Sequence, residues 1–96
     1  MKEREYILSL YEIYKNILSL KEKNYFEDYY FEDFSLQEIA DNNSVSKSYV
    51  SKIINSIENK LLHYEKELGI YDKNNKIREI IVSLDEDIKD KIEQLW

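Results

Sequence analysis

The sequence predicts an all-α fold, and three features of its 96 residues lead to that prediction. The chain has no proline and a single glycine, Gly69, so it lacks the residues that punctuate the hairpins of sandwiches and barrels. Apolar residues recur at intervals of three and four along most of the chain, which is the period of a helix. Three Ser-x-x-Glu pairs have the spacing of the capping boxes that begin helices: Ser19/Glu22, Ser35/Glu38 and Ser83/Glu86.

Three helices are expected before residue 45. The first spans about residues 3–18, because its apolar side chains share one face. The second runs from about residue 20 to 31 and the third from 36 to about 43, each directly after a Ser-x-x-Glu pair. The apolar stripe of the first helix consists of Ile7, Leu10, Tyr11, Tyr14, Ile17 and Leu18.

A long fourth helix is expected to follow Ser46 and to end at Gly69, a residue that suits the left-handed conformation after a helix. The stretch YDKNNK, residues 71–76, is the most loop-like of the chain. A last helical segment is expected from about 76 to 95, with a possible break near Ser83. The predicted organisation is one domain over residues 1–69 and a C-terminal helical extension over residues 70–96.

The extension carries more apolar residues than a three-helix core can cover, so it is expected to pack on the fourth helix or to form a homodimer. One stripe of the extension recurs at helical spacing and consists of Leu84, Ile88, Ile92 and Leu95. The remaining apolar residues of the tail are Ile70, Tyr71, Ile77, Ile80, Ile81, Val82 and Trp96.

Charge is unevenly distributed along this acidic chain, which has 20 Asp and Glu against 14 Lys and Arg. The only locally basic stretch is residues 46–62, where three lysines stand against Glu58 alone. This stretch begins the fourth helix. Affinity for nucleic acid depends on charge near the phosphates, so the acidic total does not forbid binding.

The stretch NYFEDYYFEDF, residues 24–34, is rich in both aromatic and acidic residues and has no basic one. It could form an acidic and aromatic patch for a basic protein partner. The helical period favours an ordinary core helix with its carboxylates in solvent. The side chains then expected to point inward are Phe26, Tyr29, Tyr30 and Phe34.

Residues 35–55 have the pattern of a helix-turn-helix motif. Ala40 supplies the small residue at which the two helices approach closely, Val45 fills the turn and Ser46 caps the second helix. Two positions depart from the common pattern: Ser44 stands where glycine is commonest, and Asn43 stands where an apolar residue is usual. The inward-facing residues of the second helix are Val50, Ile53 and Ile54.

The outer face of that second helix carries side chains suited to nucleic acid. Lysine can contact phosphate or guanine, asparagine can pair with adenine, and serine can bond phosphate or a base edge. The predicted nucleic-acid-binding residues are Ser46, Lys47, Ser48, Ser51, Lys52 and Asn55.

Other classes of function find little support in the sequence. The chain has no cysteine and one histidine, His63, so neither a metal site nor a catalytic residue is expected. A single glycine cannot build a phosphate-cradling loop, so no cofactor is expected. No apolar run is long enough to span a bilayer, and the N-terminal segment is amphipathic, so we expect a cytoplasmic protein that is not an enzyme.

Taken with residues 4–34, the motif resembles a known family. The segments LSLKEKNYFEDYYFEDFSLQEIA and VSKSYVSKII look like the YlxM family of small bacterial helix-turn-helix proteins, which is similar in fold to region 4 of sigma-70 factors. The resemblance covers about residues 4–70 and fades after Gly69. It implies a regulatory protein linked to the signal recognition particle pathway.

Two functions therefore stay open. The first is a regulator that binds nucleic acid, either DNA or the RNA of the signal recognition particle. The alternative is a protein-interaction module that regulates the signal recognition particle GTPase or its RNA assembly without reading DNA. A homodimer would double the few basic contacts of each subunit and would allow two half-sites.

Overall fold

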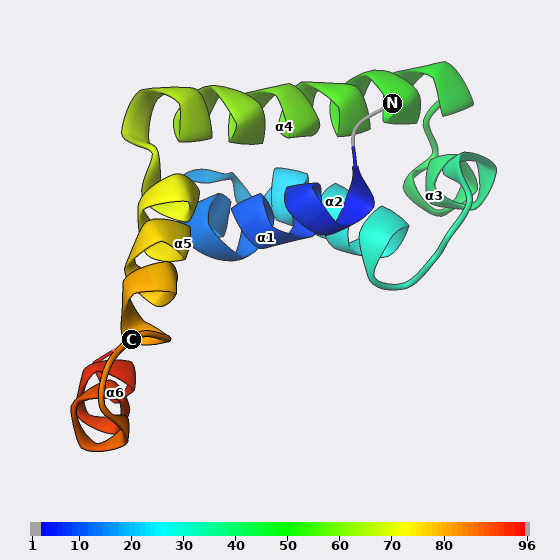
Figure 1. Cartoon of the computed structure of the whole chain (residues 1–96). Helices are drawn as coiled ribbons and strands as arrows, with labels where there is room; N and C mark the ends of the chain where they lie inside the picture. The colour runs from blue at the N-terminus through cyan, green and yellow to red at the C-terminus, as the bar shows by residue number, and fades with distance from the viewer. Residues whose placement is uncertain (1–2, 96) are drawn as a thin grey trace.

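The computed structural model describes residues 3–95, and every regular element in that range is a helix (Figure 1). The all-α prediction is confirmed. The elements in chain order are α1 (Arg4–Tyr14), the 3-10 turn η1 (Lys15–Ile17), α2 (Leu20–Tyr30), α3 (Leu36–Asn43), α4 (Lys47–Leu68), α5 (Ile70–Ile81) and α6 (Glu86–Glu93).

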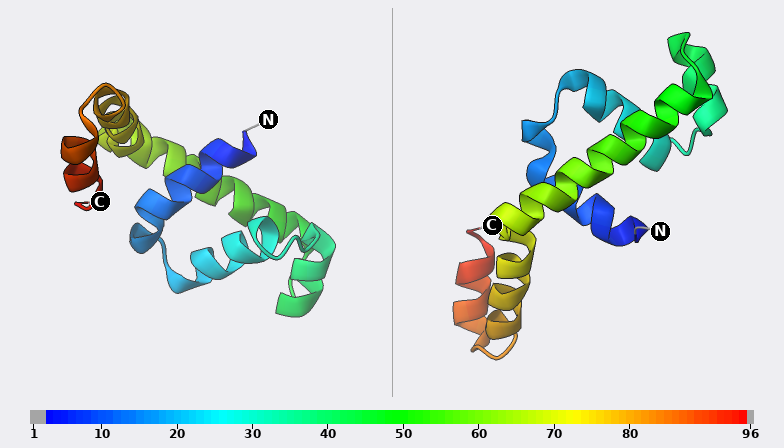
Figure 2. Two further views of the ribbon diagram at one scale, coloured as in Figure 1. Left: turned by 60° about the horizontal axis from the view of Figure 1, so that its bottom comes forward. Right: turned by 90° about the horizontal axis from the view of Figure 1, so that it is seen from above.

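The long helix α4 organises the molecule. In Figure 1, α1 and α2 lie beneath it, α3 lies at its N-terminal end, and α5 descends from its C-terminal end to α6. The two further views in Figure 2 show α1 and α2 forming a bent pair that α4 crosses. This arrangement is elongated, with extents of 54 × 25 × 23 Å. One long side of α4 is thus packed on the domain.

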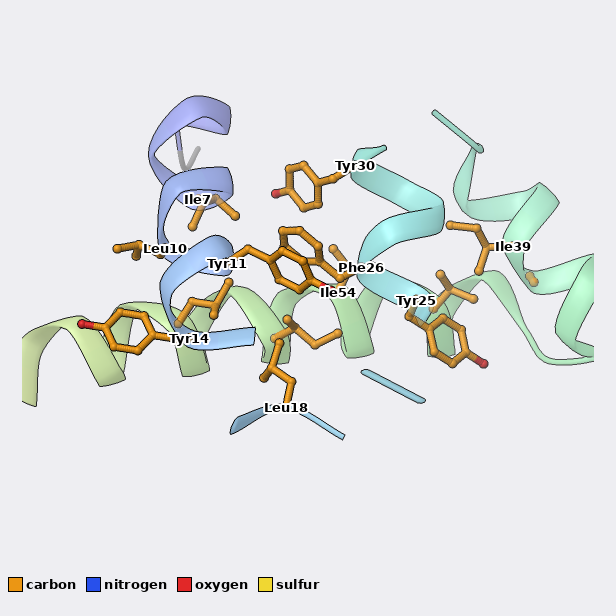
Figure 3. Packing of buried hydrophobic residues seen from close by; sticks show 14 residues of the cluster. Ile7, Leu10, Tyr11, Tyr14, Leu18, Tyr25, Phe26, Tyr30, Ile39 and Ile54 are labelled. Carbon is orange, nitrogen blue, oxygen red and sulfur yellow. The ribbon is translucent and has the colours of Figure 1, made fainter. Parts of the chain in front are cut away.

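The core lies where α1 and α2 meet α4 (Figure 3). The rings of Tyr11 and Phe26 stack with their centroids 4.0 Å apart, and Tyr30 stacks on Phe26 at 4.4 Å. Ile54 and Ile57 approach this cluster from α4. Burial of one large apolar side chain contributes about 1.5–3 kcal/mol to the free energy of folding. The buried aromatic residues of α2 therefore stabilise the fold. The expected inward positions Phe26 and Tyr30 are buried, while Tyr29 and Phe34 are partly buried.

The first helix ends earlier than the sequence predicts. Its α-helical part stops at Tyr14, and residues Lys15–Ile17 form a tighter 3-10 turn. A change from 3.6 to about 3 residues per turn shifts the following side chains around the axis. Ile17 is therefore 53 % exposed instead of joining the stripe, while Leu18 is buried.

Two of the three predicted capping boxes are confirmed. The Ser19 hydroxyl accepts a hydrogen bond from the Glu22 amide at 3.1 Å, and the Glu22 carboxylate accepts from the Ser19 amide at 2.9 Å. Ser35 and Glu38 form the same reciprocal pair, with both distances 3.0 Å. These caps fix where α2 and α3 begin.

The third capping box is wrong. The Ser83 hydroxyl instead donates to the carbonyl of Ile80 at 2.7 Å, so it belongs to the end of α5. Asp85 caps α6, with its carboxylate accepting from the Asp87 amide at 2.9 Å. Aspartate is as good an N-cap as serine, and here the start shifts by two residues. The expected break in the tail does occur at this point.

The predicted loop over residues 71–76 is also wrong, because α5 spans Ile70–Ile81 without interruption. Its N-cap is Gly69, which is in the left-handed region at φ 63° and has no side chain to cap the helix. Side chains of Tyr14 and Glu65 take that role by bonding the first amides of α5. The amides at the start of α5 thus have acceptors from Tyr14, 56 residues away, and from Glu65 of the preceding helix, although the composition of the segment is loop-like.

The tail turns away from α4 and packs beside α1, where the rings of Tyr6 and Tyr71 meet edge to face at 5.2 Å. Beyond that contact, α5 and α6 project from the domain as a helical hairpin (Figures 1 and 2). Within this hairpin, Ile81 is the one buried side chain among the described residues. Trp96, counted above among the apolar residues of the tail, lies outside the described residues.

Candidate nucleic-acid interface

Helices α3 and α4 form the expected helix-turn-helix. The fully buried Ala40 lies where the two helices meet, and its carbonyl accepts a hydrogen bond from the Val45 amide at 3.0 Å. Val50 and Ile54 of α4 are buried against the same core. Ala40 thus allows the close approach of the two helices, and Val50 and Ile54 pack inward, as the motif predicts.

The two departures from the common pattern are both accommodated. Ser44 adopts the left-handed conformation at φ 55° and ψ 42°, which costs a non-glycine residue about 1–2 kcal/mol. The side-chain amide of Asn43 donates to the Ile39 carbonyl at 2.7 Å, so this polar residue has a partner where an apolar one is usual. The turn geometry is retained without glycine.

Ser46 caps α4, as its position in the motif predicts. Its hydroxyl oxygen accepts a hydrogen bond from the Tyr49 amide at 3.0 Å. A hydroxyl that accepts one hydrogen bond keeps its own proton, which it can donate to a phosphate oxygen. Ser46 therefore combines a structural role with the candidate binding role.

The five other predicted binding residues share one solvent-exposed face of the first turns of α4. This arrangement follows from helical spacing, because Val50 and Ile54 occupy the opposite, buried face. All five are exposed: Lys47, Ser48, Ser51, Lys52 and Asn55. The structure thus brings the predicted side chains together on one surface.

One flank of this surface borders an open hollow of about 810 Å³ between α4 and the start of α1. Ser51, Lys52 and Asn55 form the α4 wall of the hollow, while Glu3 and Glu58 place carboxylates in it. Arg4 also lines it, but its guanidinium bonds the Tyr30 carbonyl and lies 3.4 Å from the Asp33 carboxylate. The hollow has mixed charge and is a poor place for a phosphate.

The other flank carries a basic residue that the sequence reasoning missed. Lys21, near the start of α2, donates to the Tyr49 hydroxyl on α4 at 2.8 Å. This hydrogen bond raises the pKa of Lys21, so its charge is retained beside the surface formed by the predicted binding residues. Residues 28 positions apart make this contact, and no local spacing could have indicated it.

The acidic side chains of α4 up to Lys66 lie on the side that faces the domain. Between Ser46 and Lys66 the helix has two acidic residues, and both are turned toward the domain. Glu58 accepts a hydrogen bond from the Tyr30 hydroxyl, and Glu65 accepts one from the Tyr14 hydroxyl at 2.7 Å. Burial and the bond to Glu58 raise the pKa of Tyr30, so this tyrosine stays a proton donor. The two carboxylates thus lie on the side of α4 that faces α1 and α2, where Glu58 also lines the hollow beside Lys52 and Asn55.

Within residues 3–95, His, Cys, Asp and Glu nowhere form a group of three that could hold a metal ion. No helix in the same range is long and apolar enough to cross a membrane. The predicted binding residues on the first turns of α4 supply exposed lysine, serine and asparagine side chains. Such groups bind ligands through charge and hydrogen bonds.

Comparison with known proteins agrees with the geometry. Residues 1–95 match the UPF0122 family, whose description is "Putative helix-turn-helix protein, YlxM / p13 like". The match extends through the tail, so the expectation that the resemblance fades after Gly69 is wrong. A UPF0122 protein of Fusobacterium nucleatum is 40% identical over 90 residues, which cover 93% of this chain and 87% of that protein.

Two further relatives carry the same family name. A UPF0122 protein of Ureaplasma urealyticum serovar 10 is 40% identical over 74 residues, covering 77% of this chain and 75% of that protein. One of Clostridium botulinum is 31% identical over 91 residues, covering 95% of this chain and 84% of that protein. The similarity to this family thus extends beyond the helix-turn-helix motif to nearly the whole chain.

Proposed function

We propose that this chain, which belongs to the UPF0122 family of helix-turn-helix proteins, is a regulatory DNA-binding protein that places residues 47–55 of α4 in the major groove. The observation that carries the proposal is the shared exposed face of the side chains predicted for this task. Lys52 and Asn55 would read base edges, while Lys47 and the serines would contact phosphates.

Binding by one chain alone would be weak. Few lysines lie on the recognition surface, and the chain as a whole carries a net charge of −6. A cytoplasmic homodimer would double these contacts and place two recognition helices on neighbouring half-sites. The exposed apolar residues of the α5–α6 hairpin support such a dimer.

The family resemblance suggests the signal recognition particle pathway as the setting of this regulation. The RNA of that particle is then a second candidate target. The major groove of A-form RNA is deep and narrow, so a recognition helix would contact such a target through its shape and loops. Duplex DNA fits the exposed face of α4 better.

A second function is favoured by a different observation. The α5–α6 hairpin exposes Ile80 at 62 % and Val82 at 71 %, which suits a protein partner as well as a second copy. Under this alternative the chain is a protein-interaction module that regulates the signal recognition particle GTPase or its RNA assembly. The hairpin, and not α4, would then carry the contacts.

One experiment separates these functions. Tagged chain is recovered from native cytoplasm with and without nuclease treatment, using the unaltered protein and the variant Lys52→Glu with Asn55→Ala. We expect the unaltered chain to retain DNA and the variant to lose it at unchanged helicity, since each contact contributes about 1–3 kcal/mol.

The matched control is Lys23→Glu with Asn24→Ala, which makes the same two changes on α2, outside both the predicted binding residues and the α5–α6 hairpin. The control should retain DNA as the unaltered chain does. Equal DNA recovery by all three proteins would contradict the proposal. Recovery of one protein partner that survives nuclease treatment and the Lys52 variant would favour the interaction module.

A further inference from the structure

The outer face of α4 stays exposed, polar and without acidic side chains well past the helix-turn-helix motif. Side chains on the face opposite the buried Ile57 and Leu61 form a continuous exposed row, here called the α4 stripe. Its members recur at three- and four-residue intervals: Ser48, Lys52, Asn55, Asn59, His63 and Lys66. The first three belong to the predicted recognition surface, and the last three lie outside it.

The α4 stripe is free of carboxylates for a structural reason. Glu58 and Glu65 occupy the side of α4 that faces α1 and α2, where tyrosine hydroxyls donate to them. Glu67, in the last turn of α4, is the first acidic residue on the solvent side. Lys60 borders the row, and its charge is offset by Glu22 at 2.6 Å.

The described part of the chain leaves this side of α4 open. In Figure 1 the other helices lie below α4, and the view from above in Figure 2 shows no helix crossing it beyond its first turns. The tail descends on the packed side, because Glu65 and Tyr14 direct the start of α5 there. A ligand bound at Lys52 could therefore extend along the whole helix.

We propose that the DNA interface continues along the α4 stripe through Asn59 and His63 to Lys66, so that the C-terminal turns of α4 contact the duplex backbone beside the site read by residues 47–55. This inference rests on the proposed function. From Ser48 to Lys66 the stripe is about 27 Å long at 1.5 Å per residue, whereas the major groove is about 12 Å wide.

The difference in length determines what each half of the stripe touches. A straight helix cannot follow the curved groove over its full length, so its N-terminal turns would enter the groove and its later turns would cross a flanking phosphate strand. Amide, imidazole and ammonium groups are all donors to phosphate oxygen. Asn59, His63 and Lys66 would then add affinity without adding sequence preference.

The test uses fluorescence anisotropy with a random-sequence DNA duplex of about 20 base pairs at low salt, where backbone contacts dominate. The variant Asn59→Glu puts a negative charge in the middle of the stripe. Its control is Asn24→Glu, the same change at an exposed position of α2. Asn24 comes two residues after Glu22, so it lies on the side of α2 away from Lys60 and α4.

We expect Asn59→Glu to weaken binding about ten-fold relative to Asn24→Glu. A second pair tests the end of the stripe. Lys66→Gln should reduce the steepness of the log–log salt dependence by about one unit per bound chain. Its control, Lys23→Gln, lies on α2 two residues after Lys21 and so on the other side of that helix, and it should leave the salt dependence unchanged.

The possible outcomes are distinct. If the unaltered chain binds no duplex DNA, the proposed function fails and the inference fails with it. If the unaltered chain binds, and Lys52→Glu with Asn55→Ala weakens binding while Asn59→Glu and Lys66→Gln match their controls, the interface ends at the motif and only the inference is overturned. Binding of duplex RNA in place of duplex DNA would overturn both.

Discussion

The Tyr14 hydroxyl donates a hydrogen bond to the Glu65 carboxylate across 2.7 Å, and these two side chains together bond the first three amides of α5. The hydroxyl oxygen accepts from the Ile70 amide at 3.2 Å, and the carboxylate accepts from Tyr71 and Asp72 at 3.0 and 3.1 Å. One pair of residues thus links α1, the end of α4 and the start of α5. It sets the direction in which the tail leaves the domain.

Replacing Glu65 should destabilise the start of α5. We expect Glu65→Ala to lower the free energy of unfolding by about 1–2 kcal/mol, the usual effect of losing an N-cap acceptor. Glu67→Ala is the matched control, because Glu67 is exposed on the same last turn of α4. Urea denaturation followed by circular dichroism measures both. Equal midpoints for the two variants would show that Glu65 does not cap α5.

Gly69 should tolerate no other residue without cost. It is in the left-handed region at φ 63°, where a Cβ atom would meet nothing within 4 Å, so the penalty comes from the backbone and not from a clash. We expect Gly69→Ala to destabilise the chain by about 1 kcal/mol, and Gly69→Asn by less, because asparagine adopts this conformation more easily. Thermal unfolding of the two variants compares these costs. A Gly69→Ala variant as stable as the unaltered chain would contradict the assigned strain.

The sequence predicts those features whose partners lie within a few residues. The capping boxes at Ser19 and Ser35 and the exposed row from Lys47 to Asn55 depend only on helical spacing, and the structure has them where expected. Helix α5 was missed because neither of its caps stands at the N-cap position. Tyr14 bonds the Ile70 amide from 56 residues away, and Glu65 bonds the next two amides from within the preceding helix. Lys21 was missed because its partner on α4 is likewise distant in the chain. Contacts between distant segments are set by packing, which periodicity does not describe.

Alkaline pH should destabilise the fold. Burial, followed by hydrogen bonds to Glu27 and Glu58, raises the pKa of Tyr11 and Tyr30 above the ordinary value of 10.0. A raised pKa in the folded state favours the neutral form there, so the unfolded chain ionises first. The contribution of these two tyrosines to the free energy of unfolding is therefore fully present below pH 10, and it is lost as the pH rises above that value.

Urea midpoints measured at a series of alkaline pH values test this expectation. Tyr11→Phe with Tyr30→Phe should flatten the decline above about pH 10, since phenylalanine has no proton to lose. The decline should also coincide with the rise in tyrosinate absorbance that accompanies unfolding. Urea midpoints that fall equally in both proteins would assign the decline to other groups.

DNA binding should depend on salt only moderately. Three lysines lie on or beside the outer face of the first four turns of α4, and Lys60 among them is paired with Glu22. For a dimer we expect the logarithm of the association constant to fall with the logarithm of the salt concentration at a slope of about −2 to −5. Each neutralised phosphate contributes about −0.9 to that slope. Anisotropy titrations across a range of salt concentrations measure it. A slope near about −10 would require a large basic surface elsewhere on the chain.

The α5–α6 hairpin should hold a homodimer together. Two short helices that bury one side chain between them, Ile81, gain little stability alone, because isolated helices of this length are marginal in water. Pairing with a second copy would cover the apolar residues that the hairpin exposes, among them Ile80, Val82 and Ile88. The hairpin carries both basic and acidic side chains, so a two-fold arrangement could match opposite charges across the interface.

Two variants separate dissociation from unfolding. Ile88→Asp with Ile92→Asp should dissociate the dimer or unfold the hairpin, because Ile92 is partly buried. Val82→Asp should dissociate it without unfolding, since Val82 is 71 % exposed in the single chain and an aspartate there stays in solvent. Sedimentation equilibrium measures the mass, and circular dichroism confirms the helix content of each variant. A single species near 11.7 kDa for the unaltered chain at tens of micromolar would exclude the dimer, and the recognition helices would then act singly.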